Sequence, residues 1–236
     1  MIRRVGILGG TLDPIHCGHL DLGAAVEDAL ELTSLLVIPA NRPPHRPPPD
    51  ASGFHRFAMV ALAVAGRAGW QASDLELTYD APSYTSTTLQ RLHARGYHPA
   101  ELFFVIGADA FAEIRTWRDY PEMLEGTHFA VVSRPRCPVS ELRERLPELA
   151  VRLVDASLKG QAPTPTSIFL IDAPTADVSS TAIRQRLFAG QPISGLVAPS
   201  VEQHIEQHGL YHSIASNHRE PERRTDPTAG RLHGQS

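Results

Sequence analysis

Short runs of apolar residues alternate along the chain with longer segments in which apolar residues recur every three or four positions. The runs predict strands at residues 5–8, 35–38, 102–106, 128–133, 151–153 and 168–171, with a further extended segment at 70–78. The periodic segments predict helices at 20–32, 54–67, 111–117, 140–146 and 201–209, one that ends at residues 95–96 and one that ends before Gly190. Such alternation is typical of an α/β fold with a mostly parallel sheet and helices on both of its faces.

Three segments follow neither periodicity. Residues 39–49 are dense in proline, which predicts a loop of extended character, and residues 157–166 are rich in Gly, Pro and Thr, which predicts an exposed loop. From residue 213 onward the chain is polar and cannot bury enough apolar surface to order itself. We therefore expect one domain over residues 1–212 and a disordered tail over 213–236.

Composition excludes several classes of protein. The chain has 236 residues, 42% of them hydrophobic and 20% charged, and its net charge of −4 gives no reason to expect nucleic-acid binding. Cys17 and Cys137 follow neither zinc nor redox spacing. No apolar run reaches the length of a secretory signal or a membrane span, so we expect a cytoplasmic protein without membrane contact. The sequence leaves a homo-oligomer open.

The most distinctive stretch is GGTLDPIHCGH at residues 9–19, between the first predicted strand and the first predicted helix. Such a turn gathers backbone N–H groups and a helix N-terminus, both of which attract an anion. His16 and His19 fit three roles here: metal ligands, a packed core pair, or donors to a polyphosphate. The glycines before them favour the polyphosphate, and we expect no metal held by the protein itself. Gly18 is expected to let a ligand approach the backbone.

The pattern G-G-T-x-D-P-x-H-x-G-H resembles the signature of the nucleotidylyltransferase superfamily. The resemblance implies a Rossmann-like, doubly wound α/β fold and an ATP site that includes Gly9, Gly10, Thr11 and both motif histidines. Leu12 stands where an aromatic residue is common in bacterial members, a difference that concerns packing. Further blocks resemble the superfamily in the same order, over roughly residues 2–211.

Two of these blocks resemble nucleotide-binding segments. Gly107 and Asp109 follow a predicted buried strand, where Asp109 fits either a ribose hydroxyl or the N-cap of the next helix. The block VSSTAIR at 178–184 resembles the S-S-T-x-I-R signature. It combines hydroxyls, a helix N-terminus and a cation one turn further on, so Ser180, Thr181 and Arg184 are expected to hold the β and γ phosphates of ATP.

Other segments narrow the resemblance to the nicotinate mononucleotide adenylyltransferases. His45 and Arg46 stand in the proline-rich loop, where that family has a P-P-H-K segment that touches phosphates. PSYTSTTL at 82–89 is similar to the segment that presents backbone to the pyridine carboxylate, so Tyr84 and Thr85 are expected there. Ser83 or Thr85 is expected to be the N-cap of the helix that follows.

Three more candidate residues are Trp117, Arg134 and Arg56. The resemblance implies a role for some of them, and the sequence leaves alternatives open for others. Trp117 matches the family's G-x-D…W block, in which the indole stacks on the pyridine ring, whereas a plain core tryptophan is the alternative. Arg134 corresponds to the family's S-R-P position, at the mononucleotide. Arg56, near a helix start, is either a surface residue or a residue that holds the loops around the site.

The resemblance implies adenylyl transfer from ATP to nicotinate mononucleotide, giving deamido-NAD and pyrophosphate. His16 and His19 would be catalytic, stabilising charge on the transferring and leaving phosphates. Mg²⁺ would arrive with ATP rather than occupy a protein site. The alternatives are the same chemistry with nicotinamide mononucleotide, the less fitting pantetheine phosphate, and a nucleotide sensor without catalysis.

Overall fold

The structure is a computed structural model that describes residues 3–44, 47–156 and 166–212. Over these residues it forms one seven-stranded sheet in the order β3-β2-β1-β4-β5-β7-β6, and every pair of neighbouring strands is parallel. The expected tail, nearly all of the expected 157–166 loop, and the candidate residues His45 and Arg46 lie outside the described ranges.

The strands are β1 (Val5–Gly10), β2 (Ser34–Pro39), β3 (Trp70–Ala72), β4 (Leu102–Gly107), β5 (His128–Val132), β6 (Leu153–Asp155) and β7 (Ile168–Ile171). The α-helices are α1 (Cys17–Leu30), α2 (Gly53–Val64), α3 (Thr85–Ala94), α4 (Ala108–Phe111), α5 (Leu142–Arg145), α6 (Ser180–Phe188) and α7 (Pro199–Gln207). Short 3₁₀ turns are η1 (Pro99–Glu101), η2 (Ile114–Thr116), η3 (Glu122–Glu125), η4 (Val139–Glu141) and η5 (Pro147–Leu149).

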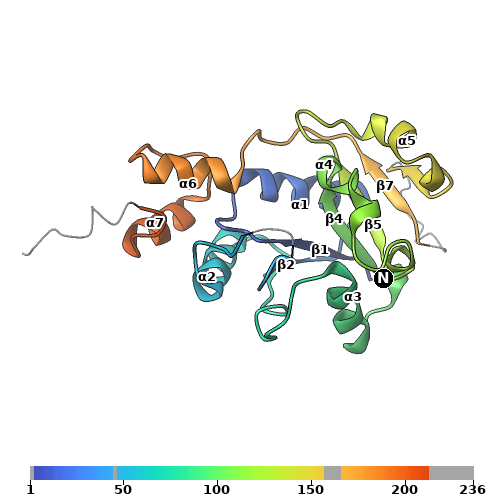
Figure 1. The fold of residues 1–236 in the computed structure, drawn as a ribbon, viewed down its shortest axis with the longest axis horizontal. Coiled ribbons are helices and arrows are strands. Elements are labelled where there is room, and N and C mark those ends of the chain that lie inside the picture. The colour runs from blue at the N-terminus through green and yellow to red at the C-terminus, as the bar shows by residue number, and fades with distance from the viewer. Residues whose placement is uncertain (1–2, 45–46, 157–165, 213–236) are drawn as a thin grey trace, which may run out of the picture.

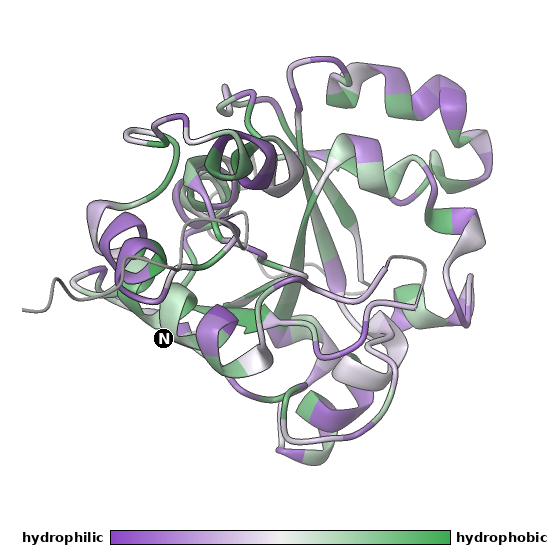
Figure 2. Cartoon of the chain, turned by 60° about the vertical axis from the view of Figure 1, so that its left-hand side comes forward, coloured by the Kyte–Doolittle hydropathy of each residue, from purple (hydrophilic) through white to green (hydrophobic). Residues whose placement is uncertain are grey.

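Side chains of the central strands alternate between two hydrophobic cores, one on each face of the sheet. In β4, Phe103 and Val105 join the core that contains α1, α2, α6 and α7, whereas Leu102, Phe104 and Ile106 join the core that contains α3, α4 and α5. This period of two explains why the central strands read as apolar runs and are mostly green in Figure 2. The expected doubly wound α/β fold is therefore confirmed.

The helices are distributed unevenly around this sheet. Figure 1 shows α6 and α7 together at one end of the molecule, and α5 with β7 at the other. Helix α2 packs against both β2 and β3 and also against α7. The last two helices thus belong to the half of the molecule that contains the first three strands. Among the described residues, no helix combines the length and the apolar composition that a membrane span requires.

Several expected boundaries were wrong. The extended segment at 70–78 ends at Ala72, because residues after it form turns in which Leu77 donates to the carbonyl of Asp74 at 2.8 Å and Leu75 is fully buried. The expected helix at 111–117 is instead the single turn α4, which begins at Ala108, followed by η2. The expected strand at 151–153 begins at Leu153, since Val151 is 95% exposed. In each case an apolar residue of the expected element lies in a turn or on the surface instead.

Candidate active site

The strand order reverses direction between β1 and β4, and the candidate residues gather at this point. Pairings Gly10–Pro39 and Gly107–Val132 show that the carboxyl ends of four central strands reach the same edge of the sheet. In doubly wound sheets, ligands bind in the crevice outside the carboxyl ends at such a reversal. The turn after β1, the turn after β4 and the segment after β5 all open onto this edge.

The two motif histidines lie against each other at the start of α1. Their ring centroids are 3.8 Å apart, and Nδ1 of His19 accepts the backbone N–H of His16 at 3.3 Å. His16 is buried, and its own Nδ1 has no hydrogen-bond partner among the described residues. Burial, followed by the positive charge of Arg134, lowers the pKa of His16 to about 4. The ring is therefore neutral near pH 7.

Arg134 reaches this point from the carboxyl end of β5. Its Nη1 is buried and likewise lacks a hydrogen-bond partner in the described part of the chain. Gly107 makes room for it, since a Cβ there would lie 3.0 Å from the Cγ and Cδ atoms of Arg134 and 2.6 Å from Oδ1 of Asp109. A buried guanidinium nitrogen without a partner is costly unless an acceptor, such as an anion, completes it. Arg134 thus supplies positive charge to the floor of the candidate site, and His16 supplies a neutral imidazole beside it.

Gly18 has a role different from the one that its sequence position suggested. A Cβ on Gly18 would lie 3.2 Å from the carbonyl oxygen of Ala176 and 3.3 Å from the ring of His16. The atoms that need this space therefore belong to the protein itself, and Gly18 lets His16 fold back over the helix start. Burial and the carboxylate of Asp21 raise the pKa of the neighbouring Cys17 thiol, as expected for a residue that merely fills a variable position.

Two charged residues, to which the sequence assigned no definite role, hold the turn after β1 in place. Asp13 is buried and accepts the backbone N–H groups of Asp50 at 2.8 Å and Ala51 at 3.1 Å. Arg56 is 2% exposed and donates to the carbonyl oxygens of Thr11 at 2.8 Å and of Ala40 and Ala51. Of the two roles left open for Arg56, the structure supports the one that holds the loops around the site.

The late S-S-T block lies beside the first motif. Ser179 caps α6 by accepting from Ala182, whereas the hydroxyl of Ser180 donates to the carbonyl of Pro14 at 2.9 Å. Arg184 donates to the carbonyl of Asp13 at 2.8 Å, and its Nε lies 2.5 Å from the carboxylate of Asp50. Thr181, Arg184 and Tyr211 line an open pocket of about 690 Å³ next to this contact. The structure thus brings the two expected anion-binding segments together.

The expected mononucleotide segment is ordered by contacts with the start of the proline-rich loop. Tyr84 is the N-cap of α3 and its side chain makes no capping bond, so the expectation that Ser83 or Thr85 caps this helix was wrong. The hydroxyl of Ser83 instead accepts the backbone N–H of Asn41 at 2.9 Å. Thr85 is the first residue of α3 and is half-buried.

Trp117 stands close to the same helix start. The guanidinium of Arg118 lies 4.6 Å from the ring centre of Tyr84, which places the segment that carries Trp117 alongside the start of α3. Trp117 is half-buried, with its ring edge-on to Phe104 at 6.1 Å. Asp109 is exposed at the beginning of α4, where Gly107 rather than Asp109 is the N-cap.

Fold and site define the class of protein: a nucleotidyltransferase of the cytidylyltransferase-like family, whose model matches residues 7–186. A probable nicotinate-nucleotide adenylyltransferase of Desulfatibacillum aliphaticivorans is 40% identical over 217 residues, which cover 88% of this chain and 99% of that protein. Another from Pseudomonas fluorescens is 40% identical over 214 residues, 89% of this chain and 98% of that protein. The chain belongs to the nicotinate-nucleotide adenylyltransferase family.

A solved structure agrees at the level of the fold. A nicotinic acid mononucleotide adenylyltransferase of Plasmodium falciparum, determined in complex with NaAD, matches with a TM-score of 0.67 at 17% identity. The match covers 89% of this chain and 97% of that one. At this low identity the likeness concerns the arrangement of strands and helices.

Proposed function

We propose that this chain transfers the adenylyl group of ATP to the 5′-phosphate of nicotinate mononucleotide, giving deamido-NAD and pyrophosphate in NAD biosynthesis. The observation that carries the proposal is the pair of buried polar atoms, Nδ1 of His16 and Nη1 of Arg134, that lack hydrogen-bond partners among the described residues at the sheet's carboxyl edge. Phosphate oxygens are the ligands that such a pair fits, and family membership supplies the identity of the substrates.

The reaction needs no covalent enzyme intermediate. An oxygen of the mononucleotide's 5′-phosphate attacks the α-phosphorus of ATP, the new P–O bond forms in line, and the bond to the bridging oxygen breaks. Pyrophosphate leaves with the electron pair of that bond. Because the nucleophile is already an anion, the protein contributes alignment and stabilisation of charge.

We assign different candidate residues to the two ends of ATP. We assign His16 and His19 to the transferring and leaving phosphates. Gly9 and Gly10 end β1 and Thr11 begins the turn that follows, and their backbone N–H groups are assigned to the ATP phosphates. Gly107 and Asp109, at the carboxyl end of β4, are assigned to the nucleoside. Neutral His16 would donate through an N–H, as an imidazole tautomer does, rather than as a cation.

The β and γ phosphates are assigned to the start of α6. Arg184 faces an open pocket that Thr181 also lines, where it contacts the exposed carboxylate of Asp50 in addition to the carbonyl of Asp13. Ser180 supports this end indirectly, since its hydroxyl fixes the carbonyl of Pro14. Within the described residues, no group of three acidic, imidazole or thiol ligands gathers at these positions. We therefore assign Mg²⁺ to ATP itself: the ion would arrive bound to the phosphates and neutralise part of their charge.

The acceptor is assigned to the opposite side of the edge. Tyr84 and Thr85 begin α3, whose first N–H groups suit a pyridine carboxylate, and Trp117 offers an aromatic face nearby. Arg134 would contact the mononucleotide phosphate close to His16. His45 and Arg46, assigned to the same phosphate, remain expectations from the sequence.

Product identification tests the proposal directly. Purified protein is incubated with ATP, Mg²⁺ and nicotinate mononucleotide, and products are identified by mass. We expect deamido-NAD and pyrophosphate in equal amounts, and neither product without the mononucleotide. ATP consumption without a dinucleotide product contradicts the proposal, and equal kcat/KM with nicotinamide mononucleotide contradicts the preference for the acid.

Variants of the H-x-G-H motif test the assigned roles. His16→Ala and His19→Ala are each expected to lower kcat by about 10²–10³-fold, the usual cost of removing one donor to transition-state charge. Cys17→Ser lies between them and should keep kcat near that of the unmodified protein. Circular dichroism checks that all three proteins are folded. Retention of full kcat in His19→Ala would remove that residue from the mechanism.

A further inference from the structure

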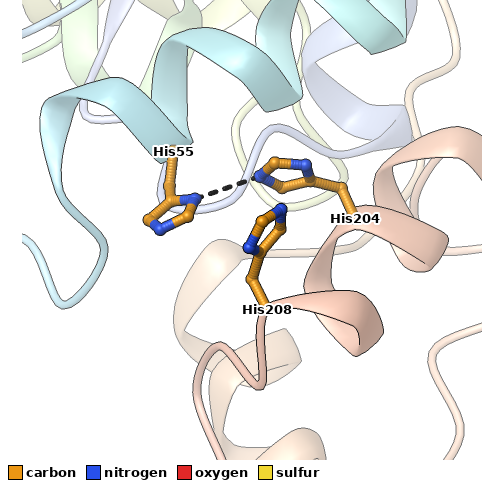
Figure 3. A group of neighbouring side chains, drawn as sticks. All are labelled: His55, His204 and His208. Carbon is orange, nitrogen blue, oxygen red and sulfur yellow. Dashed lines mark hydrogen bonds between the residues drawn. The ribbon is translucent and has the colours of Figure 1, made fainter.

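Three histidines gather at the contact between α2 and α7, outside the site described above. His55 lies in the first turn of α2, His204 lies on α7, and His208 is the C-cap of α7 (Figure 3). One ring nitrogen from each lies within 4.8 Å of the other two. Nδ1 of His55 and Nε2 of His204 share a hydrogen bond at 3.2 Å. Figure 3 shows the three rings converging on one point from the two helices.

We propose that His55, His204 and His208 bind a divalent late transition-metal ion, with Zn²⁺ the best match. Three imidazoles without a carboxylate are a donor set for Zn²⁺, Ni²⁺ or Cu²⁺, whereas Mg²⁺ and Ca²⁺ require oxygen ligands. Solvent or a mobile ligand would take the fourth position, because His208 is exposed. The sequence led us to expect no metal held by the protein, and this site departs from that expectation.

The spacing of the nitrogens fits a tetrahedral ion. With Zn–N bonds of about 2.0–2.1 Å, two ligand nitrogens stand roughly 3.3 Å apart in a tetrahedron. His55 and His204 already have this separation, at 3.2 Å. His208 needs an approach of at most about 1.5 Å, within the reach of a rotamer change for an exposed side chain at a helix end. The metal-free pair must keep one ring neutral, because one of its two nitrogens accepts the shared proton.

Sequence spacing supports the same conclusion. His204 and His208 are four residues apart on one helix face, the spacing with which two histidines bind one metal ion. His55 comes from a helix that packs directly on α7, and this contact is fixed further along by the bond from Ser200 to the carbonyl of Leu62 at 3.2 Å. The backbone therefore presents all three ligands without rearrangement of the helices.

A metal here would fasten the C-terminal helix to the element that supports the first motif. His55 immediately precedes Arg56, which holds the carbonyls of Thr11 and Ala40. Tyr211 follows His208 by three residues and bonds to Asp13. The ion would act on the stability of this corner, because none of the three histidines belongs to the proposed catalytic site.

Metal titration of the full chain tests the proposal. Protein is stripped with a chelator and dialysed, and Zn²⁺ is then titrated in competition with a chromophoric chelator. We expect one Zn²⁺ per chain with a submicromolar Kd, and a Tm that rises by about 5 °C or more at a hundredfold excess over Kd. His204→Gln and His208→Gln should each weaken binding by about a hundredfold and abolish the rise in Tm.

Two controls separate this site from other histidines. His98→Gln changes the histidine that is the N-cap of η1, and a His218→Gln/His233→Gln double variant removes the two histidines of the C-terminal 24 residues. Both should bind Zn²⁺ as the unmodified chain does. The proposal is overturned if the unmodified chain binds no Zn²⁺ at micromolar concentration. It is also overturned if the His204 and His208 variants keep full affinity, which would place the ion elsewhere.

Discussion

The hydroxyl of Tyr211 donates to Oδ1 of Asp13 at 2.7 Å, which joins the residue beyond the last helix to the turn after the first strand. The same buried carboxylate accepts the N–H groups of Asp50 and Ala51, at the end of the proline-rich loop. Burial and the charge of Asp13 raise the pKa of the Tyr211 hydroxyl far above its ordinary value, so it remains a donor. Two distant segments thus converge on the carboxylate of Asp13.

Tyr211→Phe removes this donor and leaves a buried carboxylate with one partner fewer. Hydrogen bonds to charged groups contribute about 1.5–3 kcal/mol, so we expect the free energy of unfolding to fall by about that amount. Urea denaturation measures the change. Tyr79→Phe is the matched control, because Tyr79 is 46% exposed and its hydroxyl loss should cost under about 0.5 kcal/mol. Equal effects of the two substitutions would contradict a structural role for the Tyr211–Asp13 bond.

Arg184 is shared between the protein and its proposed substrate. Its Nε contacts the carboxylate of Asp50 at 2.5 Å, and that carboxylate is largely exposed. ATP phosphates would have to displace Asp50, so Asp50→Asn should lower the KM for ATP with little change in kcat. Because partly exposed ion pairs are worth about 0–1 kcal/mol, we expect a reduction of up to about fivefold. Steady-state kinetics with Arg184→Lys as comparison, where KM should rise, test this. A higher KM in Asp50→Asn would mean that Asp50 positions Arg184 instead of competing for it.

Much of this architecture follows from the hydrophobic pattern. The unbroken run in β4 required burial on both faces, and the glycine pair before His16, which ends β1, placed a helix start at a strand end. The superfamily motifs then located both sides of the crevice. Arg56 was ambiguous because a cation near a helix start is unfavourable on dipole grounds alone, whereas the three carbonyls that it holds come from two loops, the turn after β1 and the connection between β2 and α2.

Other features depend on tertiary contacts that no local pattern records. The partners of Asp13 come from residues 37, 38 and 198 positions away in the sequence. His204 and His208 carried a metal-binding spacing, but their third partner, His55, lies on a helix far earlier in the chain. Residues 75–77 alternated like a strand because Leu75 fills the core from within a turn. Local sequence could not separate these cases, since the residue types are the same.

Stability should depend on pH below neutrality. Burial is the main cause that lowers the pKa of both His16 and His128 to about 4, from an ordinary value of 6.5. Between these values the unfolded chain binds protons that the folded chain does not, so stability is fully present above pH 6.5 and is lost as the pH falls toward 4. Each histidine contributes roughly 3 kcal/mol at most.

His128→Asn isolates one of these contributions. The Asn oxygen can accept the N–H of Ser167 in place of Nδ1, which accepts it at 2.9 Å, but it does not titrate. We expect the loss of unfolding free energy between pH 7.0 and 4.5 to be smaller in this variant by about 2–3 kcal/mol. Urea denaturation at both pH values measures this. An unchanged loss would show that His128 does not contribute to the acid sensitivity.

Gly107→Ala tests whether Arg134 must lie beside His16. The added Cβ would meet Oδ1 of Asp109 at 2.6 Å and the side chain of Arg134 at 3.0 Å. Both neighbours are side chains that can move, so the Tm should change by only a few degrees, whereas the displaced guanidinium should lower kcat/KM by about 10–100-fold. The pKa of His16, measured by NMR, should rise as the charge of Arg134 moves away. A Gly107→Ala/Arg134→Gln double variant should have the kcat/KM of Arg134→Gln alone, because the glycine acts through the arginine. Additive losses would instead assign Gly107 a role apart from Arg134, through its neighbour Asp109 or in the approach of the nucleotide.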